Sequence, residues 1–226
     1  MHLFDFHIHS HFSEDSRMDT RTILRVAKKR GLSGVAITDH NTVKGGLVAK
    51  QENSNNNFTV IVGSEIRTDV VEIIGLFLNK TILSTDPHQV IDEIRSQGGI
   101  TVLPHPFRSF IIPHRNQGLQ RGISEEIMQR IQLIEVFNAR TRVKDNQKAR
   151  DLASKLKKPM VTGSDAHFYQ EVGQVRTSVA PYTNEEELRK NLVKGKTIIE
   201  LKSDCFLKAI PFILLSGIYS RQRRLY

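Results

Sequence analysis

Three histidines and three carboxylates lie within the stretch DFHIHSHFSEDS at residues 5–16. Imidazole and carboxylate groups together suit zinc, manganese and iron, so this stretch predicts a metal site close to the N-terminus. At the two-residue period of a β-strand, its side chains would separate onto a polar face and an apolar face. The polar face would carry Asp5, His7, His9 and His11, and the apolar face Phe4, Phe6 and Ile8.

The same types of side chain recur at the ends of later apolar runs. In a parallel β-barrel the carboxyl ends of the strands face one mouth, where substrates bind, so these positions would converge on one site. They exceed what one tetrahedral metal site can use, which implies more than one metal ion. The positions are His7, His9, Asp39, His40, Glu65, His105, Asn138, Asp165 and His167.

Short apolar runs alternate with longer amphipathic stretches from residue 3 to about residue 202, which is typical of repeated βα units. A (β/α) barrel is the simplest way to close such a chain. Helices are expected at 20–31, around 45–46, at 86–96, at 143–157 and before 195. Strands are expected at 3–9, 34–40, 59–66, 70–78, 99–106, 130–138, 158–167, 174–180 and 197–201.

The chain of 226 residues fits one large domain, which we place at 1–202, followed by an apolar and basic tail at 203–226. Lys208 and Pro211 interrupt the apolar run of the tail, which argues against a membrane span. We expect the tail to pack on the domain or on a sister subunit. Residues 107–123 form a long connection, of the kind that acts as a lid or a binding segment.

Lysine and arginine outnumber aspartate and glutamate by 33 to 24, which gives a formal charge of +9. Such a surface should attract phosphates, nucleic acid or anionic lipid. Cys205 is the single cysteine, so an internal disulfide framework and a cysteine-cluster zinc site are excluded, and a cytoplasmic location is expected. The N-terminus lacks the features of a signal peptide, and no stable membrane insertion is expected.

Several motifs, taken in order, resemble those of the PHP family, the polymerase and histidinol phosphatase domains, from residue 5 to about residue 201. DFHIHS resembles the first motif of the family, Asp-x-His-x-His-Ser or Thr, and SEDS resembles its Ser-x-Asp-Ser continuation. The other matching segments are ITDHN, GSEI, PHPF, IEVFNAR and GSDAH. The resemblance implies a distorted (β/α)7 barrel with a metal site at the C-terminal mouth of its strands. It also implies two to three divalent metal ions, of manganese, zinc or iron, and phosphoester hydrolysis.

The resemblance extends to individual residues. It places Glu65 in the bridging position between metals and prefers Asp15 to its neighbour Glu14, while Asp39 and Asp5 would orient the histidines. The implied metal ligands are His7, His9, Asp15, His40, Glu65, Glu72, His105, Asp165 and His167. The implied catalytic residues are Asp39, Glu65, His105 and Asp165. Glu72 replaces a histidine found in many relatives, and Asn138 a ligand found in some, which favours two full metal sites over three.

Two cations about 3.5–4 Å apart lower the pKa of a bridging water, hold its hydroxide in line with phosphorus and neutralise the phosphate oxygens. No protein nucleophile is then needed, and the sequence contains neither a Walker loop nor a Gly-x-Ser-x-Gly elbow. The candidates for binding the substrate phosphate are Arg108, His114 and Arg140. The candidates for stacking on a base are Phe107, Phe110, Phe168 and Tyr169.

The expected substrate is a small phosphorylated molecule, a nucleotide or a short oligonucleotide. Histidinol phosphate is an alternative within the same chemistry. A non-catalytic, metal-stabilised module that binds nucleic acid or a partner would show an eroded ligand set, and here the set is largely intact. A barrel hydrolase of C–N bonds would normally show a carboxylated lysine or a single His-x-His strand, so the separate SEDS and TDHN motifs favour the phosphoesterase.

Overall fold

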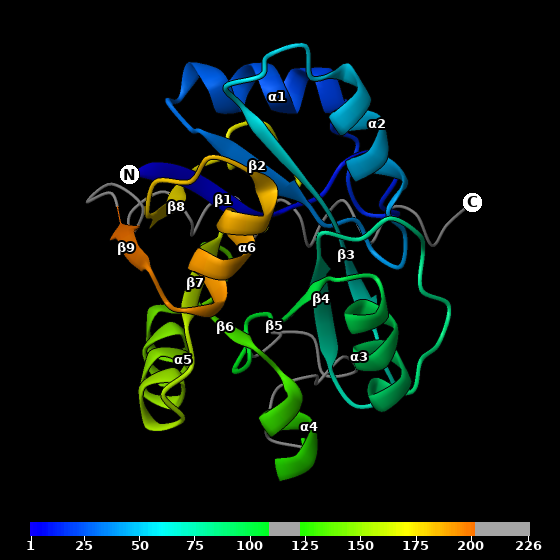
Figure 1. The fold of residues 1–226 in the computed structure, drawn as a ribbon, viewed down its shortest axis with the longest axis vertical. Helices are drawn as coiled ribbons and strands as arrows, with labels where there is room; N and C mark the ends of the chain where they lie inside the picture. Colours follow the sequence, from blue (N-terminus) through cyan, green and yellow to red (C-terminus); the bar gives the residue numbers. More distant parts are fainter. Residues whose placement is uncertain (109–122, 202–226) are drawn as a thin grey trace.

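The computed structural model describes residues 1–108 and 123–201, and its strands form one sheet that curves into a barrel (Figure 1). Phe110, His114 and the expected tail at 203–226 lie outside the described residues. The elements are β1 (His2–Ile8), α1 (Thr20–Lys29), β2 (Gly34–Ile37), α2 (Lys44–Glu52), β3 (Thr59–Arg67), β4 (Glu72–Leu76), α3 (Pro87–Ser96), β5 (Ile100–Leu103), α4 (Glu125–Arg130), β6 (Leu133–Asn138), α5 (Val143–Lys155), β7 (Met160–Gly163), β8 (Val175–Val179), α6 (Glu185–Val193) and β9 (Thr197–Leu201).

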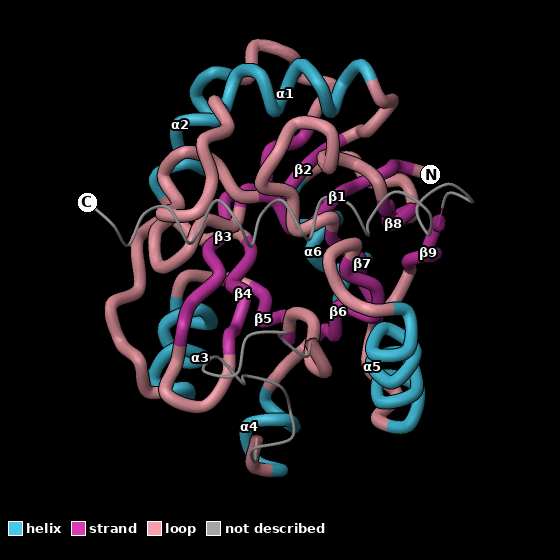
Figure 2. The backbone as a smooth tube through the Cα atoms, turned by 180° about the vertical axis from the view of Figure 1, so that it is seen from behind, coloured by secondary structure: helices cyan, strands magenta, loops and turns pink. Residues whose placement is uncertain are grey.

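The sheet has the order β7-β6-β5-β4-β3-β2-β1-β8-β9, and it nearly closes because the chain beyond β7 returns to β1. The Asp165 N–H donates to the His7 carbonyl oxygen (2.8 Å), and the His9 N–H donates to the Ala166 carbonyl oxygen (2.9 Å). β8 pairs antiparallel with the first half of β1, and β9 pairs antiparallel with β8. The α/β barrel is therefore confirmed, with two strands that extend the sheet beyond the ring of β1 to β7; Figure 2 shows the ring from behind.

One strand of the ring, β4, runs against its neighbours. The pairs β1–β2, β2–β3, β5–β6 and β6–β7 are parallel, whereas β4 is antiparallel to both β3 and β5. The pairing register sets Glu72, at the start of β4, opposite Arg67, at the end of β3. Glu72 therefore lies at the same mouth as the carboxyl ends of the parallel strands, although it begins its own strand.

Helices cover the outside of the ring, and aspartate side chains cap the first turns of α1 and α3. Asp19 accepts a hydrogen bond from the Thr22 N–H at the start of α1 (2.9 Å). Asp86 accepts one from the Gln89 N–H at the start of α3 (2.9 Å), where Pro87 occupies the first turn. The inner faces of α1 and α2 pack against β1, β2 and β3 through Ile8, Ile23, Leu24, Ala27, Val35, Ile37, Ala49 and Val60.

A second apolar cluster receives side chains from all the strands of the ring. Its members include Phe4, Phe6, Ala36, Ile61, Ile74, Val102, Leu133 and Val161. Ile8 packs in the cluster under α1 and α2 instead, so the expectation that Phe4, Phe6 and Ile8 share one face of β1 is wrong. The register between β1 and β2 shifts between Asp5 and Ile8, and an irregularity of this kind interrupts the alternation of a strand.

Candidate metal centre

The mouth of the barrel brings together every side chain that the family resemblance implies as a metal ligand. These side chains come from β1 and the loop after it, from the carboxyl ends of parallel strands, and from the start of β4. They form overlapping groups, in each of which one ligand atom per residue lies within 4.8 Å of the others. The groups are His9, Asp15, His40 and His167; His7, His105 and Asp165; His7, His9 and Glu65; and Glu65, Glu72 and His105.

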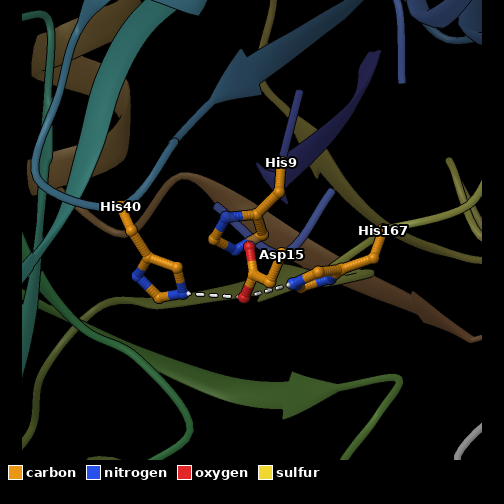
Figure 3. A group of neighbouring side chains, drawn as sticks. All are labelled: His9, Asp15, His40 and His167. Carbon is orange, nitrogen blue, oxygen red and sulfur yellow. Dashed lines mark ion pairs between the residues drawn. The ribbon is translucent and has the colours of Figure 1, made fainter. Parts of the chain in front are cut away.

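Asp15 is the centre of the first group (Figure 3). Its Oδ2 atom lies 3.3 Å from His40 Nε2 and 3.0 Å from His167 Nε2. The His9 ring completes the group, with its centroid 4.7 Å from that of His40 and 4.4 Å from that of His167. Glu14 forms an ion pair with an arginine of β3 instead. The structure thus places Asp15, and not Glu14, among the imidazoles, as the SEDS motif predicts.

Glu65, at the end of β3, turns its two oxygens toward different neighbours. Its Oε2 atom lies 3.2 Å from His7 Nε2 and 3.3 Å from His9 Nε2. Its Oε1 atom lies 2.9 Å from His105 Nε2, which in turn lies 3.8 Å from an oxygen of Glu72. Glu65 thus lies between two sets of imidazoles, and its bridging role, which the resemblance implies, stays a prediction.

The imidazoles are held so that their remaining nitrogen atoms converge. His7 Nδ1 contacts Glu135 Oε1 (3.1 Å), and His9 Nδ1 contacts Ser13 Oγ (3.2 Å). The Nδ1 atom of His167 contacts a main-chain carbonyl oxygen (2.8 Å). Because a partner on one ring nitrogen fixes the orientation of the ring, each of these residues presents Nε2 to the mouth.

This set of donors fits divalent metal ions. His40 Nδ1 is buried and has no hydrogen-bond partner among the described residues, although Glu65 Oε2 lies 3.4 Å from it. The Nε2 atoms of His7 and His9 face each other at 3.0 Å. Buried lone pairs at such distances need a proton or a cation between them. Imidazole and carboxylate donors suit zinc, manganese or iron, and the shared members of the groups suit more than one ion.

The charges of the site keep its central carboxyl groups ionised. Burial acts to raise the pKa of Glu65, but the imidazoles of His7 and His40 hold that pKa well below its usual range. Burial acts in the same direction on Asp165, and the Arg108 guanidinium together with His7 holds its pKa well below the usual range. Both side chains are therefore carboxylates at neutral pH, the form that binds a metal ion.

Two of the ligand positions have an uncommon backbone conformation. His105 has φ of 26° and Asp165 has φ of 53°. Positive φ is uncommon outside glycine and costs free energy, and such residues cluster at functional sites. The His105 N–H donates to Glu135 Oε2 (2.8 Å), and the Asp165 N–H donates to β1. These hydrogen bonds hold both residues in conformations that turn their side chains into the mouth.

Sequence reasoning missed Glu135, which lies in β6 and is 2% exposed. Besides His7 Nδ1 and the His105 N–H, it accepts a hydrogen bond from Asn138 Nδ2 (3.1 Å). A Cβ at Gly163 would come within 2.3 Å of its Oε1 atom, so a glycine is needed there for this approach. The available signal was a glutamate inside an otherwise apolar strand, within the IEVFNAR motif.

Two carboxylates that were expected to orient histidines bond mainly to the main chain around them, and Asp5 accepts a hydrogen bond from the N–H of His7 (3.3 Å). Asp39 accepts hydrogen bonds from the N–H and the hydroxyl of Ser10. Asp5 accepts them from the N–H groups of Ser164 (2.9 Å) and Gly173 (2.7 Å), and burial raises its pKa to about 6. Both carboxyls thus fix the loops that carry the ligands, and side chains such as Glu135 hold the rings.

Arg108 and Arg140, the described candidates for binding phosphate, both lie beside Asp165. Arg108 Nη1 donates to Asp165 Oδ2 (2.7 Å), and Arg140 Nη1 lies 3.5 Å from the Asp165 carbonyl oxygen. The side chain of Arg108 is 17% exposed, so it lies at the edge of the mouth and is still largely buried. Among the aromatic candidates, Tyr169 accepts a hydrogen bond from the N–H that begins α1 (2.8 Å), and a lysine ammonium lies 5.9 Å from the Phe107 ring centroid.

Comparison with known proteins identifies the family of the chain. A PHP-associated family model, PHP_C, matches residues 143–197. The chain is 32% identical to the uncharacterized protein MJ0417 of Methanocaldococcus jannaschii over 209 residues, which cover 91% of this chain and 82% of that protein. A two-domain Bacteroides vulgatus protein that contains a PHP-like metal-dependent phosphoesterase shares the fold, with a TM-score of 0.71 at 18% identity over 93% of this chain and 69% of that one. The chain belongs to the PHP family.

Structures related to this PHP chain include a nuclease. The lesion-specific endonuclease of Pyrococcus furiosus superposes with a TM-score of 0.61 at 17% identity, over 87% of this chain and 57% of that one. At such identities the likeness concerns the PHP fold alone. Within residues 1–108 and 123–201 of this PHP chain, no helix combines the length and apolar character needed to cross a bilayer.

Proposed function

We propose that this PHP chain is a metal-dependent phosphoesterase, a hydrolase whose substrate phosphate is bound at the barrel mouth. The observation that carries the proposal is the shared carboxylate of Glu65, which faces His7 and His9 through one oxygen and His105 through the other. Arg108 adds a cation at the edge of this arrangement. A related structure described as a PHP-like metal-dependent phosphoesterase supports the same chemistry.

Each part of the mouth has a role in this proposal. Two to three divalent ions of manganese, zinc or iron, when bound, would supply a polarised water and would neutralise charge on the phosphate oxygens. Glu65 and Asp165 remain ionised and fix where positive charge is held, and His105 lies against the shared carboxylate. Arg108 and Arg140 orient the phosphate. Asp39 acts indirectly, because it holds the loop that follows His9.

A nucleotide or a short oligonucleotide is the substrate that we infer. The formal charge of +9 favours polyanions, and a related fold belongs to an endonuclease. Histidinol phosphate stays in the test as the alternative monoester. The cytoplasmic location expected from the sequence stays a prediction.

The test is phosphate release from nucleoside monophosphates, nucleoside bisphosphates, short oligonucleotides and histidinol phosphate, each with manganese, zinc or iron. His9→Ala should abolish metal-dependent turnover, because His9 belongs to two of the ligand groups. His88→Ala is the matched control, since His88 is partly exposed on α3 and contacts Arg130. Turnover that is equal in the wild type and His9→Ala, or that needs no metal, would contradict the proposal.

A further inference from the structure

We propose that α1 carries a binding surface for the backbone of a single-stranded polynucleotide, which leads the strand into the metal centre. We name this surface the α1 stripe; it consists of Arg17, Arg21, Arg25 and Lys28. The inference rests on the proposed function, because it selects a strand over a free mononucleotide as the substrate of the same site.

The stripe begins at the metal centre. Arg17 follows Asp15 by two residues and is exposed. The start of α1 is fixed to the rim of the mouth, because the Asp19 N–H donates to the hydroxyl of Tyr169 (2.8 Å), two residues after the His167 ligand position. α1 then runs along the outside of the barrel beside α2, as both views show (Figures 1 and 2).

Three cations of the stripe share one face of the helix. Arg21, Arg25 and Lys28 are spaced by four and three residues, the spacing that stacks side chains on one side of a helix. With Leu24 and Glu52 they line a groove of about 390 Å³ between α1 and the end of α2. Arg21 has 78% of its side chain exposed, so its guanidinium reaches solvent over this groove.

The carboxylates along the stripe are occupied by local bonds. Glu52 accepts hydrogen bonds from Arg21 Nε (2.8 Å) and from the Thr20 hydroxyl. Asp19 caps α1 through the Thr22 N–H. Around the groove, the three cations Arg21, Arg25 and Lys28 outnumber the one lining carboxylate, Glu52, so an anionic backbone meets net positive charge there.

The length of the stripe suits a short strand. From Arg21 to Lys28, α1 advances roughly 10 Å at the rise of an α-helix, about the axial length of three stacked nucleotides. The charges of a phosphate backbone repeat along such a line. A mononucleotide bound at the mouth would not extend to the stripe. The cations would hold the strand through its phosphates and would not read its bases.

The test measures binding separately from turnover. Fluorescent single-stranded phosphorothioate oligonucleotides of about two to ten nucleotides are titrated onto the metal-loaded protein by anisotropy at several salt concentrations. The double variant Arg21→Gln/Arg25→Gln should bind the longest strand roughly tenfold more weakly near 0.1 M salt, and its log–log salt slope should fall by about 1.4, at 0.7 per phosphate contact. Lys155→Gln/Lys194→Gln removes the same charge from exposed positions on α5 and after α6, and should change neither value.

A variant of opposite sign guards against a simple loss of folding. Glu52→Gln removes the acidic group from the groove, so strand affinity should rise while the stripe stays intact. Equal losses in the stripe variant and the control variant, or affinity that does not increase with strand length, would overturn the proposal. So would binding of the stripe to vesicles containing phosphatidylserine in place of oligonucleotides, which would assign it to a membrane surface.

The two proposals fail in different ways. Length-dependent strand binding by a protein that releases no phosphate from any substrate would overturn the phosphoesterase and keep the stripe. Phosphate release whose kcat/KM is independent of strand length, with the stripe variant equal to the wild type, would keep the phosphoesterase and overturn the stripe.

Discussion

The two ends of the barrel interior use the same strands for opposite purposes. β1 contributes Phe4 and Phe6 to the apolar cluster and then His7 to the mouth, and β6 contributes Leu133 and then Glu135. The parallel strands β3, β5 and β7 continue in the same order: Ile61 before Glu65, Val102 before His105, and Val161 before Asp165. In β4, which runs the other way, the order is reversed, and Glu72 precedes Ile74 and Leu76. Strand direction therefore decides which residue types lie at which end.

The energetics of the two ends differ as their compositions do. At the apolar end, each buried side chain adds to stability in proportion to the area that it removes from water. At the mouth, buried carboxylates and imidazoles cost desolvation, which is offset only by mutual pairing and by bound cations. Substitutions at the mouth should therefore remove metal binding and activity, and those at the apolar end should remove stability and leave metal binding and activity per folded molecule unchanged.

The largest effect is expected from Glu65→Gln. The amide keeps the volume of the side chain but removes the charge that is shared between His7, His9 and His105. Phosphate release should fall by about 10³-fold or more, since a ligand to the ions contributes several kcal/mol to the transition state. Bound metal per chain, measured by elemental analysis, should fall as well. Activity within tenfold of the wild type would show that Glu65 does not bridge.

The apolar end should respond in the opposite sense to Leu133→Ala. Leu133 is fully buried among residues from the other strands, so its truncation should cost about 2–5 kcal/mol of the free energy of unfolding. Urea denaturation measures that loss. The matched control is Leu83→Ala, because Leu83 is 87% exposed and its truncation should stay within about 0.5 kcal/mol. Activity per folded molecule and metal content should be unchanged in both variants, and a loss of metal in Leu133→Ala would break the comparison.

Glu135→Gln tests whether metal binding at the mouth depends on a side chain that orients the ligand residues but is not itself in a ligand group. The substitution leaves one acceptor oxygen where Glu135 offers two, so either His7 Nδ1 or the His105 N–H loses its partner. Metal affinity and kcat/KM should each fall by about 10- to 100-fold. The ring signals of His7 in the NMR spectrum should shift, which a general loss of stability would not produce.

Its matched control is Asp145→Asn, another buried carboxylate, which lies on α5 near Lys148. Asp145 contacts no imidazole of the mouth in the described residues, so metal affinity should be unchanged in that variant. Equal losses of metal affinity in Glu135→Gln and Asp145→Asn would remove the special role of Glu135.

Much of this comparison could be predicted from the sequence. Strand direction is uniform over most of the chain, so polar residues at the ends of apolar runs were correctly expected at one mouth. That rule predicts that His9 and Asp165 lie close together although they are far apart in the sequence. In the structure, His9 Nε2 lies 3.3 Å from Asp165 Oδ1. The preference for Asp15 followed from its place in the SEDS motif.

The remaining features depend on tertiary contacts that one strand does not encode. The irregularity between Asp5 and Ile8 arises from the pairing of β1 with β2, so strict alternation failed there. Glu135 looked like one polar residue in an apolar strand, and its role depends on the space left by Gly163 on the neighbouring strand. A pattern along one chain segment does not report the shape of the segment beside it.

The smallest effect is expected at a position that lies beside the mouth but belongs to neither end. Asp19 is exposed, and the Thr22 N–H lowers its pKa from the ordinary value of 3.8. Asp19→Ala should therefore cost about 1 kcal/mol at neutral pH through loss of the cap. A lowered pKa means that the wild-type advantage is fully present above about pH 4 and is lost as the pH falls through the pKa of the folded state. Asp19→Asn should keep most of the stability and lose the dependence on pH, as urea denaturation from neutral to acidic pH would show. If metal binding falls together with stability in Asp19→Ala, the start of α1 positions Asp15, and Asp19 contributes to the metal centre.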